Sequence, residues 1–130
     1  GTRYRCAMVK LASCLAVAAL LSACSGGCGN TVLADSVSPD GRSGAVIFQR
    51  DCGATTGYST QISVVRAGAR PTGAGNAYVA DGNHGAAVAS HGGRWIDASH
   101  LLVRYDAQSR IFKQEREIAG VQITYESVNR

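Results

Sequence analysis

Residues 58–65 read YSTQISVV, and this stretch decides the fold class. Tyr58, Thr60, Ile62 and Val64 fall on one side of an extended chain, and Ser59, Gln61 and Ser63 fall on the other. Such period-two alternation is typical of a β-strand with one buried face. We therefore expect this strand to pair within a sheet that covers a hydrophobic core.

Short apolar or alternating segments extend the same pattern along the rest of the chain. We expect further strands at residues 45–48, 77–80, 101–105, 111–113 and 121–125. Ser38-Pro39-Asp40-Gly41 forms a turn before the first of them, because proline presets φ, aspartate bonds the local backbone and glycine accepts positive φ. The prediction is a mostly β fold: a small antiparallel, sandwich-like domain over residues 39–130.

The chain begins with a different kind of segment. Arg3, Arg5 and Lys10 precede an apolar run over residues 11–21, and the small residues that follow lead to Cys24. This order is that of a secretory signal peptide. The run is shorter than the roughly 20 residues of a membrane-spanning helix. We expect a signal helix over residues 1–23 and a flexible tether over residues 24–38, where SGGCGN follows at residues 25–30.

Leu21-Ser22-Ala23-Cys24 resembles the lipobox of bacterial lipoproteins. In that family the cysteine receives a diacylglyceryl group, the leader is cleaved before it, and the new amino terminus is acylated, commonly with palmitate. The resemblance implies lipidation of Cys24 and a lipid anchor in the cell envelope. Because Ser25 rather than Asp follows, it implies the periplasmic face of the outer membrane if the source is Gram-negative. A cleaved leader without lipid, giving a secreted soluble domain, is the alternative.

Cys28 and Cys52 follow Cys24 in the exported part. In an oxidising compartment we expect them to form a disulfide bond, with a free functional thiol at Cys52 as the alternative. CGATTG at residues 52–57 is similar to a motif of small uncharacterised bacterial envelope proteins, in which it leads into a Ser-Thr-Gln strand. That resemblance implies a shared fold and no particular activity. The loop could hold an anion on backbone N–H groups, or Gly53 and Gly57 could simply supply unusual backbone angles.

Histidines provide the remaining candidates for chemistry. His84, His91 and His100, with Asp81 or Asp97, could supply zinc ligands, but their spacings match no compact ligand pattern. We therefore expect no metal and no cofactor. A Cys52–His pair for nucleophilic catalysis would need a free thiol.

Aromatic side chains divide between core and surface in this interpretation. We expect Trp95 and Tyr105 in the core, and Tyr78 exposed within the glycine-rich segment over residues 67–93. Composition makes that segment the least ordered part of the domain. Tyr78, Asn83 and His84 are accordingly the candidate partner surface.

The charge of the chain excludes one class of partner. The formal net charge is +4, from 13 Lys and Arg against nine Asp and Glu, but three of the cations precede Cys24. The rest are scattered, so nucleic-acid binding is not expected. We expect a non-catalytic, membrane-anchored envelope lipoprotein, a small β-module that binds a protein or an envelope component. An exported enzyme using Cys52 or the histidine loops is the alternative.

Overall fold

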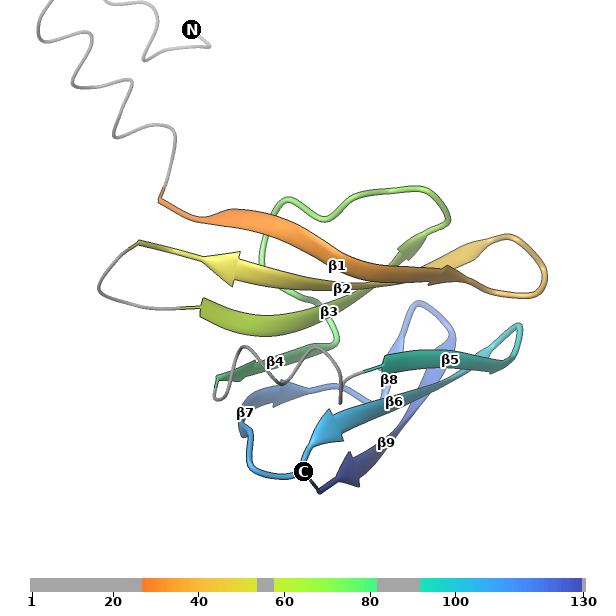
Figure 1. The fold of residues 1–130 in the computed structure, drawn as a ribbon. Helices are drawn as coiled ribbons and strands as arrows, with labels where there is room; N and C mark the ends of the chain where they lie inside the picture. Colours follow the sequence, from red (N-terminus) through yellow and green to blue (C-terminus); the bar gives the residue numbers. More distant parts are fainter. Residues whose placement is uncertain (1–26, 54–57, 82–91, 130) are drawn as a thin grey trace, which may run out of the picture.

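A computed structural model describes residues 27–53, 58–81 and 92–129. These residues form two facing sheets and contain no helix (Figure 1). The larger sheet has the order β1-β2-β3-β4-β7 and the smaller one β5-β6-β9-β8. All pairs are antiparallel except β6 with β9, which is parallel. The strands are β1 (Gly29–Val37), β2 (Ser43–Asp51), β3 (Tyr58–Arg66), β4 (Tyr78–Asp81), β5 (Gly92–Asp97), β6 (His100–Asp106), β7 (Arg110–Gln114), β8 (Glu117–Ile118) and β9 (Val121–Val128). The predicted mostly β, sandwich-like fold is confirmed.

The six strands predicted from the sequence correspond to β2, β3, β4, β6, β7 and β9. The turn at residues 38–41 is also confirmed, since Gly41 has φ of 75° and its N–H donates to the Ser38 carbonyl at 2.9 Å. The Ser38 hydroxyl donates to Asp40 Oδ1 at 2.6 Å. This hydrogen bond holds the pKa of Asp40 below its ordinary value, so the turn is stabilised by an ionised carboxylate.

The prediction of a tether up to residue 38 is wrong for residues 29–37. These residues form β1, which pairs with β2 from Gly29 opposite Asp51 to Val37 opposite Gly44. The strand lies at the sheet edge and carries a register shift between Val32 and Ala34, so it has no clean alternation. The folded domain therefore begins immediately after Cys28, with Gly29 as the first residue of β1.

The main core lies between the two sheets. Ile47 and Ile62 are register partners on β2 and β3 and face Leu101, Val103 and other apolar residues of the smaller sheet. Trp95 and Tyr105 are partly buried and pack against this core, as predicted. No described segment forms a helix long and apolar enough to cross a membrane.

A second layer covers the opposite face of the larger sheet. Val46 and Phe48 point away from the main core, yet they are 2% and 0% exposed. Residues 67–76, which we call the strap, cross this face between β3 and β4 (Figure 1). The Gly75 N–H donates to Gln61 Oε1 at 2.6 Å, and the Asn76 N–H donates to the Ser63 hydroxyl at 3.1 Å. The first part of the glycine-rich segment is therefore fixed to the sheet by hydrogen bonds, contrary to the expectation from composition.

Candidate anion-binding site

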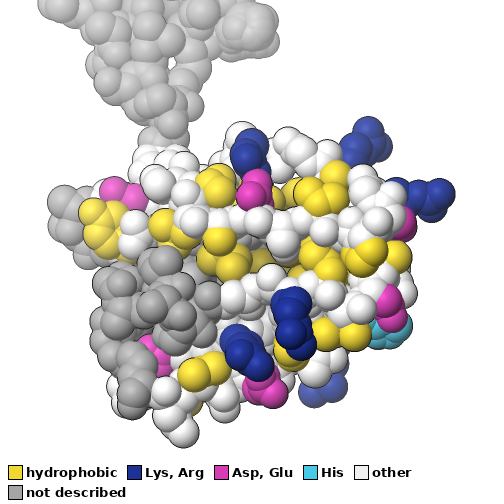
Figure 2. Space-filling model, turned by 45° about the vertical axis from the view of Figure 1, so that its right-hand side comes forward, with side chains coloured by type: hydrophobic (Ala, Val, Ile, Leu, Met, Phe, Trp, Pro, Cys, Tyr) yellow, Lys and Arg dark blue, Asp and Glu magenta, His cyan; other side chains and the backbone are white. Residues whose placement is uncertain are grey.

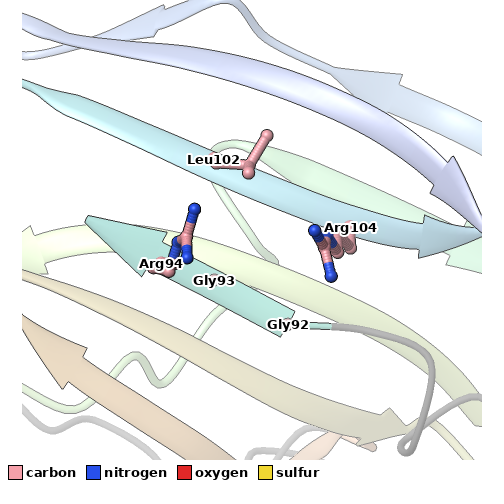
Figure 3. Close-up of a pocket in the computed structure, with 5 residues that line it drawn as sticks. All are labelled: Gly92, Gly93, Arg94, Leu102 and Arg104. Carbon is pink, nitrogen blue, oxygen red and sulfur yellow. The ribbon is translucent and has the colours of Figure 1, made fainter. Parts of the chain in front are cut away.

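A shallow hollow of about 200 Å³ opens on the outer face of the smaller sheet. It is lined by Gly92, Gly93 and Arg94 of β5 and by Leu102 and Arg104 of β6. The two arginine side chains and Leu102 project from the same side of the two strands (Figure 3). The arrangement is a pair of cationic groups beside an apolar floor.

The pairing of β5 with β6 produces this arrangement. Arg94 is opposite Leu102, and Gly92 is opposite Arg104. Residues two apart share a face, so the arginines are diagonal neighbours, about 7–8 Å apart at their Cα atoms. Glycine at position 92 leaves the space beside Arg104 open, since no atom of the described residues lies within 4 Å of the position that a Cβ would occupy there.

The two arginines differ in their electrostatic environment. Arg104 Nε donates to Glu126 Oε1 at 2.9 Å, in an ion pair whose side chains are 57% and 54% exposed. Arg94 forms no ion pair with any carboxylate of the described residues. Basic side chains gather over the smaller sheet beside an acidic one, as Figure 2 shows. A guanidinium group binds carboxylate or phosphate through two parallel N–H donors, so the hollow is suited to an anionic group.

The prediction that Tyr78 is exposed is wrong. Tyr78 opens β4 opposite Ile62 and is 0% exposed, because its side chain points between the sheets. Its ring centroid lies 6.0 Å from those of Tyr105 and Tyr125. Tyr78 therefore belongs to the core and cannot form a partner surface. Asn83 and His84, the other members of the predicted surface, lie outside the described residues, as does Cys24.

The predicted disulfide bond between Cys28 and Cys52 is confirmed. It removes the free thiol on which the cysteine-enzyme alternative depends. Gly53 has φ of 122°, so it supplies an unusual backbone angle as expected. The remainder of the glycine- and threonine-rich loop, residues 54–57, lies outside the described residues.

The histidine candidates are only partly within the described residues. His100 Nδ1 lies 2.8 Å from Asp97 Oδ1 in the turn between β5 and β6. This contact lowers the pKa of Asp97. The described ranges contain no group of three or more His, Cys, Asp or Glu residues that could hold a metal ion. His84 and His91 lie outside those ranges, so the expectation about zinc stays a prediction.

The sequence contained a signal for the arginine pair that the prediction missed. Residues 92–95 and 101–104 flank a short polar turn, and each places an arginine two residues from Gly92 or Leu102. Because Gly92 and Gly93 suggest a loop, the sequence predicts neither strand β5 nor its pairing with β6. Comparison of the chain with protein-family models, curated proteins and solved structures finds no match.

Proposed function

We propose that the protein is a non-catalytic, lipid-anchored module of the bacterial cell envelope that binds a partner bearing carboxylate groups. The anchor is the lipid on Cys24, implied by the lipobox sequence at residues 21–24. The partner is a protein or another envelope component. The observation that carries the binding activity is the pair Arg94 and Arg104 around one hollow, in which Arg104 alone is ion-paired to a carboxylate of the described residues.

Carboxylate is the group that this hollow matches in shape and charge. Each guanidinium offers a planar fork of donors, which two carboxylate oxygens can accept together. Leu102 adds an apolar surface between the arginines for the carbon chain that carries the acid. The exposed Glu126 screens Arg104 only weakly, since exposed ion pairs contribute about 0–1 kcal/mol. An incoming acid can therefore replace it.

The disulfide bond weakens the alternative that the protein is an exported enzyme with Cys52 as its nucleophile. Cys52 is bonded to Cys28, so it offers no thiolate nucleophile. The histidine-based version rests on residues 84 and 91, which lie outside the described residues. The secreted form without lipid differs from our proposal only in the state of Cys24.

Intact mass of the protein purified from its native membrane tests the anchor. The expected mass corresponds to cleavage before Cys24 plus acyl chains, with Cys28 and Cys52 alkylated only after reduction. An unlipidated mass would instead support the secreted alternative.

Binding to poly-L-glutamate, with polyphosphate for comparison, tests the arginine pair. We expect Arg94→Ser and Arg104→Ser each to weaken poly-L-glutamate binding about tenfold, as loss of about 1.4 kcal/mol would do. Arg66→Ser is the matched control, because Arg66 is an exposed arginine at the end of β3 in the other sheet. Equal loss with all three variants would mean that net charge rather than the hollow determines binding. Tighter binding of polyphosphate would assign the hollow to phosphate.

A further inference from the structure

Exposed aromatic side chains gather at one end of the larger sheet. β1 begins, β2 ends and β3 begins at this end (Figure 1), and the Cys28–Cys52 disulfide joins β1 to β2 there. We call it the disulfide end. Tyr58 and Phe112, which are 46% and 59% exposed, line a hollow of about 230 Å³ at this end. The other residues that line it are Arg50, Cys52, Ser59, Val79 and Asp81.

Strand order explains why these residues meet. Tyr58 is opposite Asp51 at the end of the β2–β3 pair, and Asp81 is opposite Arg110 at the end of the β4–β7 pair. Phe112 follows two residues later on the edge strand β7, where its ring lies under the Arg110 guanidinium at 5.2 Å. Neither aromatic ring belongs to the main core, and each keeps about half of its surface exposed.

The length of chain between the lipid and the fold determines what this end faces. Cys24 precedes Cys28 by four residues, which span at most about 14 Å when fully extended. Cys28 is held by its disulfide and Gly29 by its pairing with Asp51, so the chain cannot lengthen further into the domain. A lipid on Cys24 therefore keeps the disulfide end within that distance of the bilayer surface.

We infer that the disulfide end rests on the membrane in which the protein is anchored, with Tyr58 and Phe112 inserted at the lipid headgroup level. This inference rests on the lipid anchor of the proposed function. Tyrosine favours the membrane–water interface because its ring is apolar and its hydroxyl is polar, and phenylalanine is a common residue on the apolar face of interfacial segments. The short tether gives the patch a high effective concentration at the surface, so a weak intrinsic affinity is sufficient.

Charge does not drive this contact. Arg50 and Arg110 lie beside the rings, but Asp81 lines the same hollow and Asp51 ends the neighbouring strand. With cations and anions balanced, apolar insertion provides the attraction. We therefore expect the contact to form on zwitterionic phosphatidylcholine vesicles and to persist from about 0.1 M to about 1 M salt, where the Debye length falls from about 10 to about 3 Å.

Tryptophan quenching in vesicles tests the orientation. The lipidated chain carrying Trp95→Phe and Phe112→Trp is reconstituted in phosphatidylcholine vesicles with a headgroup spin-labelled lipid. The unsubstituted chain is the matched control, because Trp95 is its only tryptophan and Trp95 Nε1 donates to the Ser36 carbonyl at 3.3 Å. Ser36 lies eight residues beyond Cys28 along β1, or about 25 Å away. We expect at least threefold stronger quenching at position 112 than at Trp95.

A second pair of variants tests the role of the patch. Tyr58→Ser in the position-112 reporter should reduce quenching at least twofold, whereas Val37→Ser should not, because Val37 is 54% exposed at the opposite end of β1. Equal quenching of both reporters, or none at position 112 in protein that floats with the vesicles, overturns the inference and leaves the anchor intact. Protein that does not float with the vesicles contradicts the anchor, and the inference fails with it.

Discussion

Asn30 and Arg50 are register partners on β1 and β2, and together they fasten the strap to the larger sheet. Arg50 Nη1 donates to Asn30 Oδ1 at 2.6 Å. The Asn30 amide nitrogen donates to the carbonyls of Pro71 and Gly73, both at 2.9 Å. The edge strand β1, which the sequence suggested to be a tether, thus takes part in the hydrogen bonds that hold the strap over Phe48.

Asn30→Asp tests the two hydrogen bonds that the Asn30 amide donates to the strap. The carboxylate still accepts from Arg50, but it cannot donate to the two strap carbonyls. Since each hydrogen bond contributes about 0.5–1.5 kcal/mol, we expect the free energy of unfolding to fall by about 1–3 kcal/mol. Urea denaturation followed by Trp95 fluorescence measures the change. An unchanged unfolding midpoint would show that the strap is held without Asn30.

Gly75→Ala tests how closely the strap approaches the sheet. A Cβ at position 75 would lie 2.8 Å from the Tyr78 carbonyl oxygen and 2.9 Å from that of Ile62. Backbone must then move, so we expect a loss of about 1–3 kcal/mol in the free energy of unfolding. Gly73→Ala is the matched control on the same strap, because no atom in the described part of the chain lies within 4 Å of its Cβ position. Its effect should stay within about 0.5 kcal/mol, and similar losses at both positions would contradict the close approach.

Removal of the disulfide tests the start of the fold. Cys28 and Cys52 are 24 residues apart, and a loop of this length stabilises by about 3–4 kcal/mol through restriction of the unfolded chain. We expect the double variant Cys28→Ser, Cys52→Ser to lose this amount in urea denaturation. Reductant should destabilise the unsubstituted protein and leave the double variant unaffected. A reductant effect of equal size on both would assign the change to something other than this bond.

The interior strands were predictable because burial on a core face leaves a pattern in the sequence. Residues 58–65 alternate since Ile62 and Val64 face the main core, and the predicted strand matches β3 within one residue. β1 and β5 are sheet-edge strands with a register shift each, and β5 begins with two glycines. Edge strands bury less side-chain surface, so their sequences resemble those of loops.

The position of Tyr78 was mispredicted for a related reason. Tyr78 follows glycines that suggested an open loop, but Gly75 lets the strap approach the sheet closely just before Tyr78 enters the core. The arginine pair depends on the β5–β6 register, which no single segment encodes. The disulfide, by contrast, followed from the number of cysteines and the compartment that the leader predicts, because few pairings were possible.

Burial of Tyr78 predicts the response of the protein to alkaline pH. Burial raises the pKa of Tyr78 to about 12 from an ordinary 10.0, with smaller effects of Ser109, Tyr105 and Asp106. Burial also raises the pKa of Tyr125. The unfolded chain releases these phenolic protons near pH 10 while the folded chain retains them. The contribution of these tyrosines to the free energy of unfolding should therefore be fully present below about pH 10 and be lost as the pH rises toward about 12.

Tyr78→Phe separates the contribution of Tyr78 from that of Tyr125. The variant cannot ionise at position 78, so its free energy of unfolding should decline less steeply with pH over this window. A residual decline should remain because Tyr125 is still present. Urea denaturation at successive pH values, with phenolate absorbance of the folded protein recorded in parallel, measures both. Full ionisation of all tyrosines near pH 10 in the folded protein would contradict the burial of Tyr78 between the sheets.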